Sequence, residues 1–376
     1  MKRPDVIVVG AGIVGAACAL ELQARRRDVL LVDARHPGAG VTAAGMGHLV
    51  ALDESADELD LCLLSLARWD EYLATHAGPA EYVRCGTLWV AEDDAQMAHA
   101  LTRAERLGRR GWDAEALSGS RLARTEPALR AGLAGGVRVA RDGVVYPPAV
   151  ARDLAAQLVA RGGRTLFGAA VAGIGRGAVT LSSGRRIDAG DVVVAAGTDV
   201  ARLLPDMPVF PRKGHLAITA RYPRTLSHQV VSMGYGQTAA GGDALAVAAN
   251  VQPRITGQWL IGSCRQDGIA DTDVDPRVLA HVLRAAIALL PGLADMTIIR
   301  SWTGLRPATR DGRPLIGPHP ALEHVWLAAG HEGLGVTTAF GTARLLADLM
   351  LACPVSIDAS PYSPARFVHE PARHDV

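Results

Sequence analysis

The chain has 376 residues, of which 39 are Lys or Arg and 38 are Asp or Glu. This length suggests two domains, and the balanced charge gives no global field that would favour nucleic acid or an anionic membrane surface. The five cysteines are odd in number, widely spaced and unaccompanied by Cys/His pairs, so we expect no disulfide framework and no metal site. We expect a cytoplasmic protein with a small-molecule ligand, because no signal peptide precedes the first apolar strand and no apolar run reaches the about 18 residues of a membrane span.

The N-terminus has the pattern of a nucleotide-binding unit. A β-branched run over 5–9 leads into Gly10-Ala-Gly12-Ile-Val-Gly15, a helix is predicted over 16–25, and a second strand over 29–32 ends on Asp33. Strand, glycine-rich turn, helix, strand and acid in this order are the context that the dinucleotide fingerprint requires. The pattern therefore predicts a Rossmann-type dinucleotide site.

Each part of that fingerprint has a physical role. Gly10 permits the tight turn, Gly12 removes the side chain where a pyrophosphate approaches, and Gly15 lets the helix pack closely on the strand. The helix N-terminus offers N–H groups to phosphate oxygens. Asp33 can accept hydrogen bonds from both ribose hydroxyls and disfavours a 2′-phosphate. These residues alone do not distinguish FAD from NAD.

The remainder of the chain predicts an α/β fold with two interleaved domains. Helices are expected over 54–74, 95–110, 149–161, 277–290 and 336–351, and strands over 164–167, 187–196, 216–220, 245–251, 258–262 and 325–329. The run over 82–90 is strand-like but broken by Gly86. Strand, helix and strand resume near residue 145, whereas apolar alternation after residue 210 is typical of an antiparallel sheet. We therefore expect a Rossmann-like dinucleotide domain from 1–80, 145–209 and 315–376, and an α+β substrate domain with an antiparallel sheet from 81–144 and 210–314.

Further motifs follow in a specific order. They are Thr42-Ala-Ala-Gly45-Met46, Asp142-Gly-Val-Val-Tyr-Pro147, residues 192–197, Pro211-Arg-Lys-Gly214, Trp302-Thr-Gly304-Leu-Arg306-Pro307 through Gly317, and Ala329-Gly330-His331. Over nearly its full length the chain thereby resembles the D-amino acid oxidase group of FAD-dependent amine oxidoreductases. Within that group it resembles the glycine oxidases and the FAD subunits of D-hydroxyproline dehydrogenase and hydrogen cyanide synthase.

The resemblance implies FAD as the cofactor. The implied cofactor site comprises Gly10, Gly12, Ile13, Val14, Gly15, Asp33, Ala34, Arg35, Thr42, Ala43, Ala44, Gly45, Met46, Val171, Ala196, Gly197, Gly304, Arg306, Gly330, His331, Glu332, Gly333, Leu334, Gly335, Val336 and Thr337. By this resemblance, Met46 lies near the isoalloxazine ring, the backbone of Val171 contacts adenine, and the turn 330–337 lies against the flavin pyrimidine. We expect non-covalent binding, because 302–316 contain no Cys and the early motif has no His before His48.

The same resemblance implies which side chains contact the substrate. Arg306 stands at the position of the family's carboxylate-binding arginine, where a guanidinium can form two parallel hydrogen bonds; a structural ion pair is the alternative. Asn250 and Arg265 stand where glycine oxidase has a tyrosine and a methionine, which predicts a more polar pocket unless Arg265 is a solvated strand end.

Three further side chains are weaker catalytic candidates. His331 and Glu332 form a polar pair in the flavin-facing turn, where they either orient the amine or cap the turn and its helix. His48 lies near the expected ring side of the first domain and has the least support.

The expected activity is dehydrogenation of the C–N bond of a small amino acid to an imine, with hydride passing to flavin N5. The expected substrates are of the D-hydroxyproline or D-proline, glycine or N-substituted glycine class. The electron acceptor is either oxygen or a redox partner, and homo- and hetero-oligomers both stay open. The alternative from another class is a catalytically silent FAD-binding or electron-transfer subunit of a larger complex.

Overall fold

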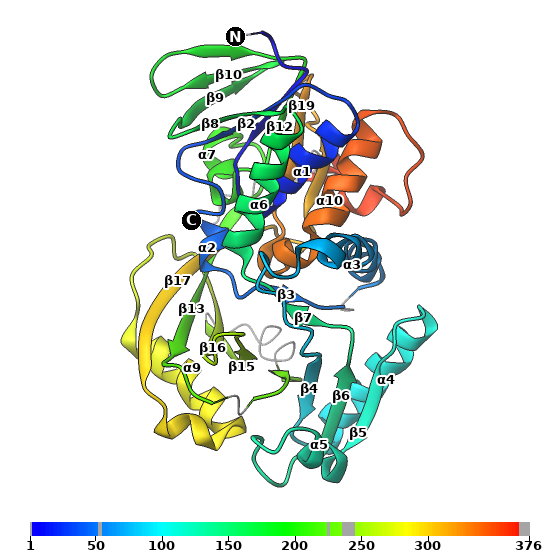
Figure 1. The fold of residues 1–376 in the computed structure, drawn as a ribbon, viewed down its shortest axis with the longest axis vertical. Helices are drawn as coiled ribbons and strands as arrows, with labels where there is room; N and C mark the ends of the chain where they lie inside the picture. The colour runs from blue at the N-terminus through cyan, green and yellow to red at the C-terminus, as the bar shows by residue number, and fades with distance from the viewer. Residues whose placement is uncertain (1, 52–54, 224–225, 235–244, 368–376) are drawn as a thin grey trace.

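The computed structural model describes residues 2–51, 55–223, 226–234 and 245–367. Two lobes are stacked along the long axis of the molecule, each around its own large sheet (Figure 1). In the first lobe the sheet has the spatial order β18 (Leu315–Pro318), β19 (Val325–Ala329), β12 (Asp191–Val194), β1 (Val6–Val9), β2 (Val29–Asp33) and β8 (Arg164–Phe167). All neighbours pair in parallel except β18 and β19, and β1 is buried along its whole length, as a sheet covered on both faces requires.

The alternation of side chains along β1 assigns its two faces to different layers. Val6 and Val8 pack in one apolar cluster with the helices α1 (Ile13–Ala24), α6 (Pro147–Ala160), α10 (Gly335–Met350) and α3 (Ala56–His76). Ile7 and Val9 pack in another cluster with a three-stranded sheet of β9 (Val171–Gly175), β10 (Ala178–Leu181) and β11 (Arg186–Asp188). The six-stranded sheet is therefore the middle of three layers.

The second lobe is built on an eight-stranded sheet. Its spatial order is β17 (Ile298–Ala308), β13 (Phe210–Thr219), β16 (Trp259–Asp267), β15 (Leu245–Pro253), β14 (Gln229–Ser232), β4 (Thr87–Ala91), β6 (Gly135–Val139) and β5 (Glu115–Ser118). Only β14 and β4 pair in parallel. The helix α9 (Pro276–Leu289) packs on β15 and β16, and α4 (Asp94–Arg109) and α5 (Gly119–Thr125) pack near the β4–β6 end.

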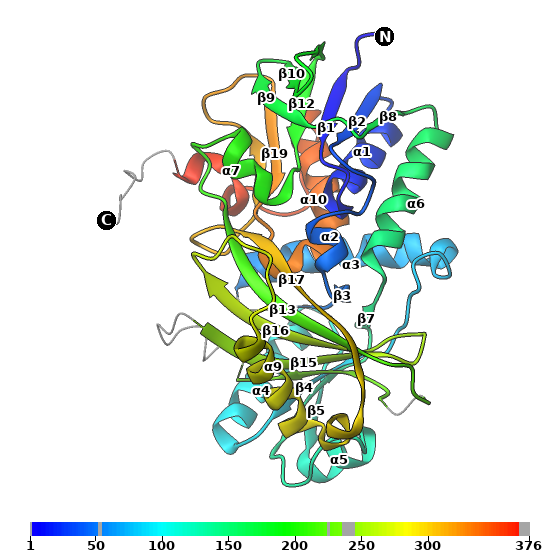
Figure 2. The same cartoon turned by 90° about the vertical axis from the view of Figure 1, so that its left-hand side faces the viewer.

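Two sets of strands connect the lobes. The short ladder of β3 (His48–Leu49) with β7 (Gly143–Val144) lies between them. Figure 2 shows the long strands β13 and β17 running from the lower lobe up to α2 (Val41–Ala44), which contacts β17. The remaining short elements are η1 (Gly197–Asp199), α7 (Val200–Leu203), η2 (Pro291–Asp295), η3 (Glu332–Leu334), η4 (Ser360–Tyr362) and η5 (Pro364–Phe367).

The predicted fold class is confirmed, but one predicted strand is wrong in detail. Residues 187–196 form two strands in different sheets, because the chain turns at Gly190, where an added Cβ would lie 2.6 Å from the carbonyl oxygen of Asp5. The run over 82–90 is interrupted at Gly86, as predicted: Gly86 has φ +69°, and the strand begins at Thr87. The predicted start of a helix at position 54 lies outside the described residues.

The described residues contain no candidate membrane-spanning helix and no candidate metal-binding cluster. None of their helices is both long and apolar enough to cross a bilayer. Within the same part of the chain, no three His, Cys, Asp or Glu side chains gather closely enough to hold a metal ion.

Candidate active site

A cavity of about 1010 Å³ is lined by residues of both lobes. It brings together all six side chains that the sequence predicted as catalytic: His48, Asn250, Arg265, Arg306, His331 and Glu332. The predicted cofactor residues also line it, except three. Gly15, Gly330 and Thr337 do not face the cavity.

The glycine-rich turn shows why Gly15 stands back from the cavity wall. Gly10 has φ +105°, and an added Cβ there would lie 2.4 Å from the carbonyl oxygen of Ala195. A Cβ on Gly15 would lie 1.9 Å from the carbonyl oxygen of Gly10. Gly15 thus lets α1 press against the turn, while Gly10 and Gly12 form the wall itself.

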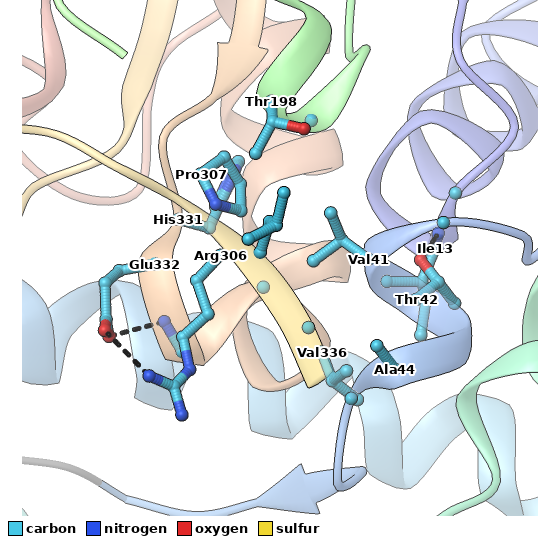
Figure 3. Close-up of a pocket in the computed structure, with 18 of the residues that line it drawn as sticks. Ile13, Val41, Thr42, Ala44, Thr198, Arg306, Pro307, His331, Glu332 and Val336 are labelled. Atoms are coloured by element: carbon cyan, nitrogen blue, oxygen red, sulfur yellow. Dashed lines mark hydrogen bonds and ion pairs between the residues drawn. The ribbon is translucent and has the colours of Figure 1, made fainter. Parts of the chain in front are cut away.

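The N-terminus of α1 points into this end of the cavity. The first intrahelical bond runs from Ala16 N–H to Gly12 O, so the N–H groups of Val14 and Gly15 precede the ladder. Ile13 N–H donates to Thr42 Oγ1 at 3.0 Å, which ties α2 to the helix start, as Figure 3 shows for these two residues. Such a helix start provides backbone donors and a positive dipole end for a phosphate.

Asp33 occupies the end of β2, where the sequence placed a ribose ligand. Its Oδ2 accepts from Ala11 N–H at 2.6 Å and its Oδ1 from Arg35 N–H at 2.7 Å. Each carboxylate oxygen has a second lone pair, so these bonds orient the group and leave it able to accept further hydrogen bonds. The carboxylate is therefore held at the cavity edge by the turn that it supports.

Small residues line the cavity both at the glycine-rich turn and on β17. A Cβ on Gly12 would lie 3.0 Å from Thr42 Oγ1, and a Cβ on Gly304 would lie 2.8 Å from Ala44 Cβ. A side chain at either glycine would therefore crowd the α2 segment beside it. A long, thin ligand such as FAD thus fits the residues present, with phosphates at the α1 end and the remainder reaching the second lobe.

At the far end three arginines surround one carboxylate. Glu332 Oε1 lies 3.5 Å from Arg265 Nε, 3.7 Å from Arg212 Nη1 and 3.8 Å from Arg306 Nη1; Figure 3 draws the contact with Arg306. Arg212 also pairs with Asp267 at 2.6 and 2.8 Å. The far end of the cavity therefore combines cationic side chains with a carboxylate that lies among them.

The guanidinium of Arg306 is fixed from behind. Its Nη1 donates to Cys264 O at 3.0 Å and its Nη2 donates to Ser263 Oγ. Gly214, on the neighbouring strand, provides the space, since a Cβ there would lie 2.6 Å from Arg306 Nη2. The distances to Glu332 exceed those of direct hydrogen bonds, so a carboxylate of a ligand can take up this side of the group.

Glu332 is held in an unusual backbone conformation with φ +46°. Burial raises the pKa of its carboxyl, but the charges of Arg306, Arg265 and Arg212 and a hydrogen bond from Gly333 N–H together hold that pKa below its usual range. Glu332 is therefore ionised at neutral pH and acts as the internal counter-ion of the arginines.

His331 is placed differently from its neighbour. Its ring is buried and its Nε2 lies 3.0 Å from Thr342 Oγ1 within α10. Burial lowers the pKa of His331 to about 3, so the ring is neutral. This geometry favours the predicted alternative in which His331 secures the turn to its helix.

The turn after β19 is anchored rather than exposed at both ends. Gly330 has φ +75°, and a Cβ there would lie 2.7 Å from Thr309 Cγ2. Thr337 Oγ1 donates to His48 O at 2.9 Å. These contacts explain why Gly330 and Thr337 support the cavity without lining it.

His48 is surrounded by side-chain amides. Its Nδ1 lies 2.9 Å from Gln229 Oε1 and its Nε2 lies 3.0 Å from Asn250 Nδ2, while Gln252 Nε2 is 2.7 and 3.2 Å from the two nitrogens. Burial, together with the charge of Arg306, lowers the pKa of His48 to about 4 although Gln229 raises it. His48 is therefore a neutral, hydrogen-bonded ring at the cavity wall.

Several site residues escaped the sequence reasoning. Arg212 and Ser263 contact the charged cluster, and Gln229 and Gln252 contact His48. Cavity residues from α4, namely His99, Arg103 and Arg106, were also missed. The motif Pro211-Arg-Lys-Gly214 was the only available signal, because the other contacts depend on strand register.

The fold and this cavity are those of a dinucleotide-binding protein whose second lobe brings charged side chains to the cavity. A family model described as FAD dependent oxidoreductase, the DAO family, matches residues 5–349. The chain belongs to this family, which confirms the predicted resemblance, the oxidoreductase activity and FAD as the cofactor.

Curated relatives and solved structures agree with this assignment. The chain is 30% identical to a glycine oxidase of Pseudomonas aeruginosa over 96% of this chain and 98% of that protein. It is 26% identical to hydrogen cyanide synthase subunit HcnC of the same species, over 98% and 97%. The crystal structure of glycine oxidase from Geobacillus kaustophilus matches with a TM-score of 0.87 at 26% identity, covering 97% of this chain and 99% of that one.

Proposed function

We propose that this enzyme dehydrogenates the C–N bond of a small amino acid. The observation that carries the proposal is the guanidinium of Arg306, which lines the cofactor cavity, is held by Cys264 O and Ser263 Oγ, and lies 3.8 Å from Glu332. A planar guanidinium with a fixed orientation is suited to hold a carboxylate by two parallel hydrogen bonds. The glycine oxidase relatives support an amino acid as the source of that carboxylate.

Both lobes have a role in this proposal. We assign residues 1–80, 145–209 and 315–376 to FAD binding, and 81–144 and 210–314 to the substrate. The turn at Gly10 and Gly12 and the start of α1 would hold the pyrophosphate, and Asp33 the ribose. The bound flavin supplies the hydride acceptor.

The protein's own groups orient the substrate and keep the site charged. Arg306 binds the carboxylate and so fixes the position of Cα, which is the main contribution of such a clamp. Glu332 keeps the arginines partly neutralised until the substrate arrives. We also propose that α10, whose N-terminus begins at Gly335 on the cavity wall, stabilises negative charge by its dipole.

The electron acceptor separates two versions of this activity. The glycine oxidase relatives favour direct use of oxygen, whereas HcnC is named as a synthase subunit and favours transfer to a partner subunit. Oxygen consumption by the isolated protein with its substrate supports an oxidase. Turnover only with a dye or an added partner supports a dehydrogenase or an electron-transfer subunit.

The test of the proposed function is an anaerobic screen of flavin bleaching. Glycine, sarcosine, D-proline and cis-4-hydroxy-D-proline are mixed with the FAD-loaded protein, and the loss of flavin absorbance is followed. At least one of them is expected to bleach the flavin rapidly. No bleaching by any amino acid would contradict the proposal and favour a silent FAD-binding subunit.

Asp33→Ala is expected to weaken FAD binding by about 1 to 3 kcal/mol, or roughly 5- to 150-fold in Kd. The loss has two sources, because Asp33 is the proposed ribose ligand and also holds the N–H groups of Ala11 and Arg35. Titration of the apoprotein with FAD measures it. Asp33→Asn retains one acceptor oxygen and should lose less; equal Kd values for the wild type and Asp33→Ala would exclude Asp33 as the ribose ligand.

The finer proposal concerns the substrate: a D-configured cyclic or N-substituted amino acid, with hydroxyproline-like compounds preferred over glycine. Arg265 and Asn250 make the cavity wall polar, and of the two we assign the contact with a substrate hydroxyl to Arg265. Arg265 is ion-paired with Glu332 and its side chain is 19% exposed, unlike a solvated strand end.

Arg265→Met is expected to lower the ratio of kcat/KM for hydroxyproline over proline by about tenfold or more, since a site that hydrogen-bonds a hydroxyl rejects the analogue lacking it. Steady-state kinetics with both substrates at one pH measure this ratio. An equal loss on both substrates, or a wild type that prefers glycine, would refute the assignment.

A further inference from the structure

A chain of hydrogen bonds runs from the core of the second lobe to the cavity wall. Thr87 Oγ1 lies 2.6 Å from Asp142 Oδ2, and Gln229 Nε2 lies 2.6 Å from Thr87 Oγ1. Gln229 Oε1 lies 2.9 Å from His48 Nδ1, and Asn250 Nδ2 lies 3.0 Å from His48 Nε2. Asp142, Thr87 and Gln229 are fully buried, whereas His48 and Asn250 line the cavity.

The surroundings of Gln229 determine which group donates and which accepts in each of these hydrogen bonds. Its Nε2 also lies 3.5 Å from Gly143 O, and a carbonyl oxygen can only accept a hydrogen bond. The amide nitrogen of Gln229 therefore faces Gly143 and Thr87, and its Oε1 faces His48. Thr87 accepts from Gln229 and donates its own hydroxyl proton to the carboxyl of Asp142. Each link leaves one choice of donor and acceptor for the next.

This series of hydrogen bonds selects one tautomer of His48. Because Gln229 Oε1 is an acceptor, the neutral ring carries its proton on Nδ1 and has only a lone pair on Nε2. Nε2 then accepts from the amide nitrogen of Asn250. Gln252 approaches Nδ1 at 2.7 Å and Nε2 at 3.2 Å with its amide nitrogen, while its Oε1 is buried without a partner among the described residues. Turning this amide by 180° places the oxygen against the ring, where it accepts from Nδ1–H as Gln229 does. Burial, aided by Arg306, lowers the pKa of His48 to about 4 and keeps the ring neutral.

The orientation of Asn250 follows from that tautomer. With its nitrogen turned to His48, its Oδ1 is buried and has no hydrogen-bond partner among the residues that the structure describes. A buried acceptor without a partner is costly in a folded protein, which indicates a donor that arrives with a ligand. Asn250 lines the cavity, so this donor belongs to whatever binds there.

We propose that Asn250 Oδ1 accepts a hydrogen bond from the amine N–H of the substrate, and that His48, Gln229 and Thr87 are positioning residues that hold this acceptor in place. The proposal rests on the proposed function. Asn250 pairs with Gly262, and the next residue, Ser263, holds the guanidinium of Arg306. The amine is on the carbon next to the carboxylate, so an acceptor beside Arg306 reaches it before any more distant substituent.

This role restricts the substrates to amines that carry an N–H. Wild-type flavin should be bleached by sarcosine about 10- to 100-fold faster than by N,N-dimethylglycine, which has no N–H when neutral. In Asn250→Leu, a side chain of similar size without an acceptor, that ratio should fall toward one. The same variant should leave the ratio of hydroxyproline to proline unchanged.

The tautomer of His48 provides a readout other than activity. In ¹⁵N-histidine-labelled protein, long-range ¹⁵N–¹H spectra distinguish the Nδ1–H from the Nε2–H form, and His48→Gln identifies the His48 signals. The wild type should show Nδ1–H. Gln229→Leu should shift the ring toward Nε2–H and also lower the sarcosine preference. Gln252→Leu is the matched control, because it removes an equally close amide and should keep Nδ1–H.

Each result has a separate meaning. An Nε2–H ring in the wild type overturns the proposal, and so does an unchanged sarcosine preference in Asn250→Leu with intact bleaching. A variant that loses hydroxyproline preference instead assigns Asn250 to a hydroxyl and also overturns it. If no amino acid bleaches the wild-type flavin, the proposed function fails and this proposal fails with it; in the other cases the proposed function stands.

Discussion

Arg306→Ala should lower kcat/KM for the substrate by roughly 30-fold to several thousand-fold, while FAD remains bound. The reason is that a buried charged partner of a carboxylate is worth about 2 to 5 kcal/mol when it is removed. Arg306→Lys should be poor as well, because one ammonium cannot bond Cys264 O and Ser263 Oγ and still offer a planar fork to the substrate. Stopped-flow flavin reduction and FAD content measure both effects.

Arg212→Ala is the matched control for this experiment. Arg212 stands opposite Arg306 in the β13–β17 register and lies at nearly the same distance from Glu332, but it does not line the cavity. Its loss removes the same charge without removing the proposed contact. If flavin reduction in Arg212→Ala is as slow as in Arg306→Ala, the effect is electrostatic and the clamp is wrongly assigned. A wild-type rate of flavin reduction in Arg306→Ala would also show that the clamp is wrongly assigned.

A second large effect is expected in the acid stability of the protein. Burial lowers the folded-state pKa of His331 from 6.5 to about 3. A lowered pKa gives stability that is present above the unfolded pKa and is lost as pH falls through the folded one. As pH falls from 6.5 to about 5, the buried neutral ring of His331 should lower the free energy of unfolding by about 2 kcal/mol. His48 should add to this loss, because its pKa is lowered too.

His331→Asn should flatten this dependence, because asparagine takes up no proton and can still reach Thr342. The melting temperature of the wild type should fall more between about pH 7.5 and about pH 5 than that of the variant. Asp142 acts in the opposite sense: burial raises its pKa to about 7, so its contribution is fully present at low pH and lost as pH rises through 7. Asp142→Asn should thus steepen the acid loss. Parallel profiles for the wild type and His331→Asn would rule out His331 as its source.

The sequence predicted those parts of the site that depend on short stretches of chain. The turn at Gly10, the acid at Asp33 and the arginine at Arg306 are each recognisable from a few neighbouring residues. The strand β19 and the helix α10 were also predicted, because their apolar patterns are local. The order of such motifs along the chain was enough to predict the family.

The rest of the site depends on register between distant strands. Glu332 meets Arg212, Arg265 and Arg306 only because β13, β16 and β17 are neighbours in one sheet. Likewise Gln229 reaches Thr87 through the parallel pairing of β14 with β4, which are about 140 residues apart in sequence. No local pattern encodes such pairings, so the counter-ion and the amides around His48 could not be predicted.

The interleaving of the two lobes also determines when the cavity can form during synthesis. The strand β1 is made well before two other strands of its sheet, because β12 begins at residue 191 and β19 at residue 325. The cavity wall at 331–336 is made later still. The nascent chain therefore carries an unfinished, apolar sheet until these residues are made, a situation that exposes proteins to aggregation and to chaperones. Capture of FAD in a complete site must consequently follow synthesis of residues 331–336.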